Sequence, residues 1–174
     1  MARLLLALGA NRSGPWGPPE RALERAVQAL SGAGLEVVRA SRVYPTAPLG
    51  PGRQAPYLNA VLVVEARQAP GALLRLMKRI ERQAGRRLGR PLGPRELDLD
   101  LLDYSGRRLN WPSRRRERGR LALPHPEMHR RAFVLVPLLE VAPHWRHPVL
   151  GVGAHGLLSA LGPVGRRTVR PPSP

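Results

Sequence analysis

Three aspartates stand together in the segment GPRELDLDLLDY, residues 93–104, and they are the only aspartates in this chain of 174 residues. In a β-strand successive side chains point to opposite faces, so Asp98 and Asp100 share one face while the leucines between them share the other. One face of the predicted strand therefore belongs to the core, and the other carries paired acid. Asp103 falls at the opposite parity and is expected to be structural or exposed.

Two carboxylates on one strand face lie only about 7 Å apart and repel each other mildly. Mg²⁺ binds through oxygen, uses one or two protein carboxylates, and completes its shell with water and substrate phosphates. The pair therefore suits a magnesium site for a phosphorylated substrate. The spacing alone leaves an alternative open, because the polar side of many half-buried strands simply faces water.

Apolar spacing, together with proline and glycine, predicts the elements that must position this strand. They are a strand at 3–10, a helix from Pro18 or Pro19 to about residue 30, strands at 35–44 and 57–67, a helix from Pro70 to about Ala84, and the aspartate strand. The order β-α-β-β-α-β is typical of the α+β ferredoxin-like fold, in which an antiparallel sheet carries both helices on one face.

The rest of the chain is predicted to add a C-terminal hairpin and a helical segment. A basic, hairpin-like stretch covers residues 105–123, and a helix is expected within the proline-bounded segment 124–143. A tail rich in proline and glycine follows, and residues 170–174 are expected to lack fixed structure. The length suits one domain, residues 1–174.

The chain carries 29 Lys and Arg against 12 Asp and Glu, a net charge of +17. Such charge raises the expectation of nucleic acid as a partner, but the bias toward Arg, Gly, Pro and Ala points to composition rather than recognition. The absence of cysteine excludes disulfides and cysteine-ligated zinc or iron–sulfur centres. Without a long apolar run, neither a membrane span nor a cleaved signal is indicated, and a soluble, cytoplasmic protein is expected.

Four stretches, taken together and in order, resemble one enzyme family. They are LALGANRSGP, YPTAPLGPGRQAPYLNA, ERQAGRRLGRPLGPRELDLDLL and RLALPHPEMHRRAFVLVPLLEVAP, which together reach from Leu5 to about Pro143. The family is 6-hydroxymethyl-7,8-dihydropterin pyrophosphokinase, of the folate pathway. The resemblance implies transfer of a pyrophosphoryl group from ATP to the hydroxymethyl oxygen of the pterin, with AMP as product, on a ferredoxin-like fold.

The resemblance also implies roles for individual residues on the nucleotide side. Asp98 and Asp100 would hold two Mg²⁺ ions, and with Arg86 and Arg95 they form the expected catalytic set. The expected ATP contacts are Glu81, Arg86, Arg87, Arg95, Leu101, Arg120, His125 and Arg131. Each has an ordinary alternative: a surface arginine, a structural histidine, or a helix-surface Glu81 paired with Arg82 or Lys78.

On the pterin side, the resemblance implies that Tyr57 and Phe133 stack on the flat ring. Thr46, Leu49 and Asn59 would read its edge. Three positions depart from the family pattern: Leu92 stands where Trp is common, Ala122 where Thr is usual, and Lys78 where Gln is familiar. These departures bear on loop closure and nucleotide contacts rather than on the class of reaction.

Two alternatives to this enzyme remain open. A basic ferredoxin-like domain could bind RNA through its sheet, although that function wants exposed aromatic residues on the central strands and no acid pair. A degenerate relative could bind pterin without chemistry, but the retained Asp98, Asp100, Arg95 and Arg131 argue against it. The expected partners are ATP and the hydroxymethyl pterin, with no nucleic acid and no membrane, and the chain is expected to be a monomer.

Overall fold

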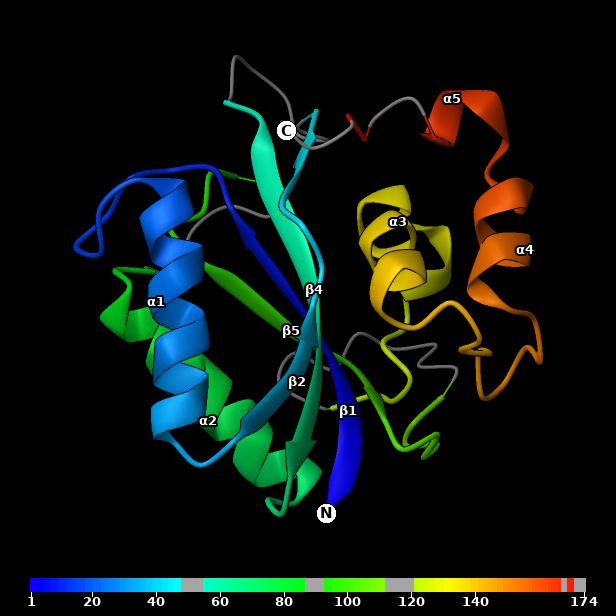
Figure 1. Ribbon diagram of the computed structural model, residues 1–174, viewed down its shortest axis with the longest axis horizontal. Coiled ribbons are helices and arrows are strands. Elements are labelled where there is room, and N and C mark those ends of the chain that lie inside the picture. The colour runs from blue at the N-terminus through cyan, green and yellow to red at the C-terminus, as the bar shows by residue number, and fades with distance from the viewer. Residues whose placement is uncertain (48–54, 87–92, 112–120, 167–168, 171–174) are drawn as a thin grey trace.

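The structure is a computed structural model, and it describes residues 1–47, 55–86, 93–111, 121–166 and 169–170. Its centre is a five-stranded antiparallel sheet (Figure 1). Along the sheet the strands run in the order β2 (Glu36–Ala40), β4 (Tyr57–Ala66), β1 (Ala2–Ala10) and β5 (Asp98–Tyr104), and β3 (Tyr44–Thr46) also pairs with β4. This order, with the chain order of strands and helices, confirms the predicted ferredoxin-like core.

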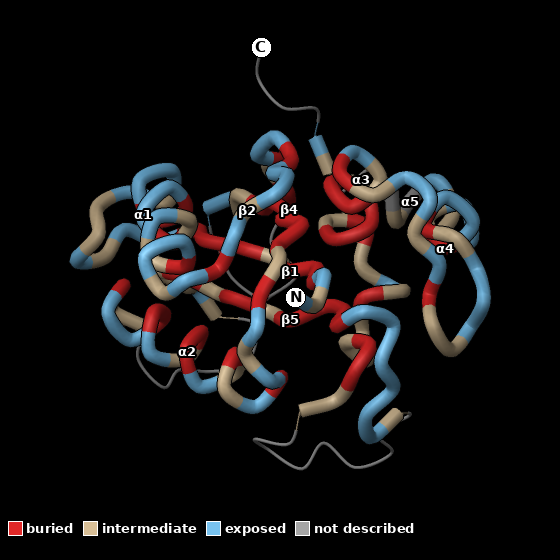
Figure 2. The backbone as a smooth tube through the Cα atoms, turned by 60° about the horizontal axis from the view of Figure 1, so that its bottom comes forward, coloured by how far each residue is buried: buried red, intermediate tan, exposed pale blue. Residues whose placement is uncertain are grey.

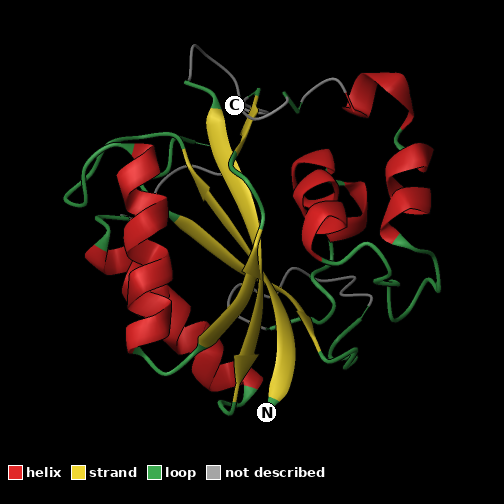
Figure 3. Cartoon of the chain, in the orientation of Figure 1, coloured by secondary structure: helices red, strands yellow, loops and turns green. Residues whose placement is uncertain are grey.

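Two helices, α1 (Pro19–Gly32) and α2 (Pro70–Gln83), cover one face of the sheet (Figure 3). Each begins with proline, whose fixed φ suits the first helical position and whose missing N–H has no helical partner there. Their buried sides, including Leu30 and Met77, pack on leucines of β1 and β5 in one apolar cluster. The apolar residues that recur at helical spacing in the sequence therefore form the side of each helix that packs on the sheet.

The opposite face is also covered, by α3 (Ala132–Val141) with α4 (Ala154–Ala160) outside it (Figures 1 and 2). A short 3₁₀ turn, Met128–Arg130, leads into α3, and α5 (Gly162–Arg166) follows α4. α3 is apolar nearly all round because it lies between the sheet and α4. The predicted helices on one face are thus only half of the arrangement, and the segment expected to be a tail contains α4 and α5.

The strand predicted at 35–44 is divided into β2 and β3. At the division Ser41 donates its N–H to the Val61 carbonyl at 2.9 Å, and its hydroxyl accepts the Val61 N–H at 3.0 Å. A side-chain oxygen thus takes the place of a backbone acceptor, and the strand bends there.

The two ends of the basic stretch after residue 105 meet as predicted. Leu109 and Leu123 exchange two backbone hydrogen bonds of 2.9 Å. Residues 112–120 lie outside the described residues. Near the C-terminus Arg170 donates its N–H to the Pro45 carbonyl at 2.9 Å, so the expected absence of fixed structure is wrong for Arg170.

A β-bulge changes the face on which Asp103 lies. Leu6 pairs with Leu101, but Leu5 pairs with Asp103, which leaves Leu102 as the extra residue. Asp103 therefore faces the same side as Asp98 and Asp100, and the parity prediction was wrong beyond Leu101. The expected structural role fits, because Asp103 is buried and its Oδ2 accepts from the Gly106 N–H at 3.2 Å and from Trp145 at 3.4 Å.

None of the helices in the described segments has the length and apolar character needed to cross a membrane.

Candidate active site

The two paired aspartates project from β5 on the face opposite α1 and α2. The side chain of Asp98 is 35% exposed and that of Asp100 is 33% exposed. Their partners across β1 are small: Gly9 stands beside Asp98, and Ala7 beside Asp100. A Cβ atom on Gly9 would come within 3.1 Å of Asn59 Oδ1. Small residues on β1 therefore keep space open in front of both carboxylates.

Two cavities meet at this pair. The smaller, about 200 Å³, lies over the ends of β1 and β4, and the larger, about 1130 Å³, lies between α2 and the segment 121–131. Both are lined by Asp100 and Arg131. A molecule in one cavity would thus reach a molecule in the other at the aspartate strand.

The smaller cavity gathers four of the five predicted pterin residues. It is lined by Thr46, Tyr57, Asn59 and Phe133, together with Arg95. Asn59 donates to the Thr46 hydroxyl at 2.8 Å, and the Tyr57 hydroxyl donates to the Gly93 carbonyl at 2.7 Å. Two aromatic rings and a fixed amide are what a flat heterocycle with polar edges needs.

The larger cavity is basic on the helix side. Arg75, Lys78, Arg79 and Arg82 of α2 line it, and Leu101, Ala122, His125 and Arg131 line it from the other elements. Cationic side chains around a cavity of this size suit a nucleotide triphosphate. Leu101, Ala122 and Lys78, which the sequence analysis linked to nucleotide contacts, all line this cavity.

The outer edge of β5 holds two of the residues predicted for the site. Among the strands that the structure describes, β5 is the last of the sheet, so its outward backbone groups have no strand beside them. The Leu99 N–H donates to Glu81 Oε1 at 2.8 Å, and the Leu102 carbonyl accepts the His125 N–H at 2.8 Å. The backbone of β5 thus holds Glu81 and His125 on either side of the Asp98–Asp100 pair.

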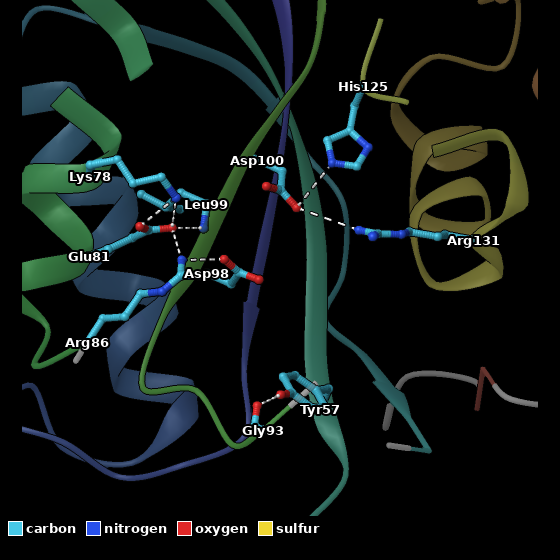
Figure 4. Close-up of polar contacts among 10 residues, drawn as sticks. All are labelled: Tyr57, Lys78, Glu81, Arg86, Gly93, Asp98, Leu99, Asp100, His125 and Arg131. Carbon is cyan, nitrogen blue, oxygen red and sulfur yellow. Dashed lines mark hydrogen bonds and ion pairs between the residues drawn. The ribbon is translucent and has the colours of Figure 1, made fainter. Parts of the chain in front are cut away.

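Glu81 is a buried carboxylate at the end of α2, with its side chain 1% exposed. Lys78 Nζ donates to its two oxygens at 2.8 and 3.1 Å, and Arg86 forms ion pairs with both Glu81 and Asp98 (Figure 4). Burial raises the pKa of Glu81, against the opposing charges of Arg86 and Lys78. The surface alternative for Glu81 is therefore wrong, although the pairing with Lys78 is present.

Asp98 is held in its ionised form. Burial alone would raise its pKa, but the positive charges of Arg86, Arg95 and Lys78 outweigh burial and leave the pKa below the ordinary value. An ionised carboxylate is the form that binds a cation. Among the described residues no three His, Cys, Asp or Glu side chains gather into a metal cage, so the pair fits Mg²⁺, which completes its shell with water and phosphate, better than a closed structural site.

His125 and Arg131 face Asp100 from the side opposite Glu81 (Figure 4). His125 Nε2 lies 3.9 Å and Arg131 NH1 3.8 Å from Asp100 Oδ2. His125 Nδ1 accepts the Glu127 N–H at 3.2 Å, which assigns the ring proton to Nε2. Burial lowers the pKa of His125 despite the nearby Asp100, so the ring is a neutral donor near neutral pH rather than a cation.

Four residues named in the sequence analysis cannot be placed. Leu49, Arg87, Leu92 and Arg120 lie outside the described residues. Sequence reasoning also missed Asn11, which is buried, accepts the Arg95 N–H at 2.8 Å and donates to the Ala55 carbonyl at 3.1 Å. A lone amide directly after a buried strand was the available signal.

Comparison with known proteins gives a consistent answer. The sequence pattern of the 7,8-dihydro-6-hydroxymethylpterin-pyrophosphokinase (HPPK) family matches residues 5–143. A 2-amino-4-hydroxy-6-hydroxymethyldihydropteridine pyrophosphokinase of Haemophilus influenzae is 39% identical over 142 residues, which covers 82% of each chain. Its counterpart from Mycobacterium tuberculosis is 36% identical over 176 residues, which covers 98% of this chain and 89% of the relative. The Synechocystis counterpart is 42% identical over 119 residues, only 57% of its own length.

Solved structures support the fold. The wild-type HPPK-DHPS of Plasmodium falciparum with SDX-DHP superposes with a TM-score of 0.66 at 16% identity and covers 92% of this chain. An HPPK-DHPS in complex with substrates gives 0.65 at 12% identity and covers 91%. This chain spans 43% of the length of each of them.

Proposed function

The chain belongs to the 7,8-dihydro-6-hydroxymethylpterin-pyrophosphokinase family, and from that premise we propose that Asp98 and Asp100 mark the point where its two substrates meet. The enzyme class follows from membership: it is an ATP-dependent pyrophosphokinase, and it transfers pyrophosphate from ATP to hydroxymethyldihydropterin in folate synthesis. The proposal concerns which residues of this chain do so.

The observation that carries the proposal is the meeting of the two cavities at Asp100 and Arg131. The smaller has aromatic rings and a fixed amide, and the larger has a cationic wall. We assign the pterin to the smaller cavity and ATP to the larger. In that arrangement the hydroxymethyl oxygen and the β-phosphorus approach each other over β5.

The side chains then divide the work. Tyr57 and Phe133 stack on the pterin, and Asn59, fixed by Thr46, reads its edge, so that the hydroxymethyl group points toward the aspartates. When bound to Asp98 and Asp100, Mg²⁺ would neutralise charge on the phosphate oxygens. We propose two ions between the two aspartates and the phosphates, because one divalent cation cannot offset two carboxylates together with the charges of ATP.

Around the phosphates, the chain supplies further positive charge and hydrogen-bond donors. Arg131 and neutral His125 lie close enough to Asp100 to donate to a phosphate oxygen bound beside it. Arg95 reaches the same place from the smaller cavity. The hydroxymethyl oxygen of the pterin forms a bond to the β-phosphorus and gives up its proton to water. The bond between the β-phosphorus and the oxygen bridging to the α-phosphate breaks, and AMP leaves with that oxygen.

We propose a monomer as the active unit. Use of ATP supports the cytoplasm as the location. The RNA-binding alternative is disfavoured because α3 covers the sheet face that such a domain would leave open, and because that face carries two carboxylates.

The decisive experiment is incubation of the protein with ATP, Mg²⁺ and 6-hydroxymethyl-7,8-dihydropterin, with AMP and ADP resolved by chromatography. We expect AMP in equal amount to the pterin diphosphate, and AMP formation slower by roughly a thousandfold or more with Asp100→Asn. ADP as the nucleotide product would overturn the reaction. Binding of both substrates by the wild-type protein without any AMP would identify a degenerate relative.

A further inference from the structure

Lys78, the only lysine of the chain, donates to both oxygens of buried Glu81. The same carboxylate accepts the Leu99 N–H and is ion-paired with Arg86. The lysine side chain is 44% exposed, whereas that of Arg86 is 19% exposed. Glu81 therefore contacts one cation, Lys78, on the side of the larger cavity, and a second, Arg86, in the interior of the site.

Arg86 has two partners, and one of them is needed elsewhere. It contacts Asp98 as well as Glu81. Under the proposed function, on which this inference rests, Asp98 holds a divalent ion. A guanidinium and a divalent cation repel each other on one carboxylate, so Arg86 must leave Asp98 when the ion arrives. The phosphates of ATP are the nearest new partner for its charge.

The departure of Arg86 would be costly for Glu81 if no other cation stood by. A buried carboxylate that loses its only charged partner is strongly destabilised. We infer that Lys78 is a positioning residue: it remains on Glu81 when Arg86 turns to the phosphates, and so keeps the Glu81 bond to the Leu99 N–H between the two metal-binding aspartates.

Charge repulsion alone predicts the opposite effect of removing Lys78 on the binding of a divalent cation. Lys78 places a positive charge near Asp98, so its removal alone should favour a divalent cation there. If Lys78 instead compensates Glu81 for the loss of Arg86, removing Lys78 should weaken cation binding. Among the described residues Arg86 is then the one cation left on Glu81, and it resists displacement. The sign of the change separates the two accounts.

The first experiment measures Mn²⁺ binding, by electron paramagnetic resonance, to the full protein saturated with α,β-methylene ATP. We expect Lys78→Met to bind Mn²⁺ about tenfold more weakly than wild type, and Lys78→Arg to restore the affinity. Arg25→Met removes one exposed charge from α1 and should change the affinity by less than about twofold. Unchanged or tighter binding by Lys78→Met overturns the inference.

A double-variant cycle tests whether the effect runs through Arg86. In the Arg86→Ala variant Glu81 lacks its interior cation in both the metal-free and the metal-bound protein. The further change Lys78→Met should therefore no longer weaken Mn²⁺ binding. An equal loss in both backgrounds would show a direct or merely structural effect of Lys78 and would contradict the inference.

Hydrogen exchange at one amide gives a readout that does not need turnover. In the protein without nucleotide, the Leu99 amide should exchange alike in wild type and Lys78→Met, because Arg86 still holds Glu81. With Mg²⁺ and α,β-methylene ATP bound, exchange should become faster in the variant only. In a separate turnover assay with ATP, kcat should fall more than the KM for ATP rises. Faster exchange already in the free variant would indicate a structural role instead.

These results can fail separately from the proposed function. Formation of AMP tests the reaction. The sign of the Lys78→Met effect on Mn²⁺ binding and the Leu99 exchange test whether Lys78 remains on Glu81 when Arg86 moves to the phosphates.

Discussion

Acidification should destabilise the fold through one buried histidine, His147. Its ring is 1% exposed and lies 5.1 Å from the ring of Trp111, 5.7 Å from that of His129 and 5.8 Å from that of Trp145. Its Nδ1 accepts the N–H groups of two following residues, at 3.3 and 3.2 Å. The ring proton is thus on Nε2, and a second proton can bind only by displacing both bonds.

The size of the effect follows from the pKa. Burial, with a smaller contribution from His129, lowers the pKa of His147 from 6.5 to about 4. The unfolded chain therefore takes up this proton below pH 6.5, while the folded chain does not until about pH 4, so the free energy of unfolding falls as the pH drops through this window. The full difference is about 3 kcal/mol, of which about 2 kcal/mol is lost by pH 5.

Urea unfolding at pH 7.5 and pH 5 measures this loss. His125 and His129 also have lowered pKa values and act in the same direction, so a variant is needed to assign the share of His147. His147→Asn keeps an acceptor at the δ position and removes the titrating ring. We expect its loss between the two pH values to be smaller than that of wild type by about 2 kcal/mol. An identical pH dependence in both proteins would refute this reasoning.

Two further predictions concern the active site. Asp98→Asn and Asp100→Asn should each lower kcat by roughly a thousandfold or more in a steady-state AMP assay with the far-ultraviolet circular dichroism unchanged, whereas Asp103→Asn should retain turnover; equal losses at all three would contradict the assigned roles. Tyr57→Ala and Phe133→Ala should each weaken pterin binding by about 1 kcal/mol or more in calorimetry and leave ATP affinity nearly unchanged; the reverse pattern would exchange the two cavities.

Local sequence patterns predicted the core of the fold because each element carries its own signal. A short apolar run that ends at Gly9 marks β1, and proline opens α1 and α2, so no long-range information was needed there. The bulge at Leu102 could not be foreseen, because the choice of which residue is left unpaired depends on the partner strand β1. α4 was missed because its seven residues are too few to show a period.

The candidate site divides in the same way. The parity of Asp98 and Asp100 follows from strand geometry, and the sequence resemblance supplied the remaining assignments. The burial of Glu81 was not predictable from α2 alone, since a glutamate beside Arg and Lys on a helix reads as a surface residue. Its burial depends on the Leu99 N–H at the open edge of β5, a contact across 18 positions of the chain.

The hydrogen bonds at the outer edge of β5 also affect whether copies of this protein associate. An uncovered edge strand offers unpaired N–H and C=O groups on which another chain can add a strand. Here the Leu99 N–H donates to Glu81 and the Leu102 carbonyl accepts from His125, so two residues of the candidate site also block strand addition. Variants at Glu81 should therefore be judged for self-association as well as for turnover, because the aspartate strand they uncover is otherwise built largely of leucine.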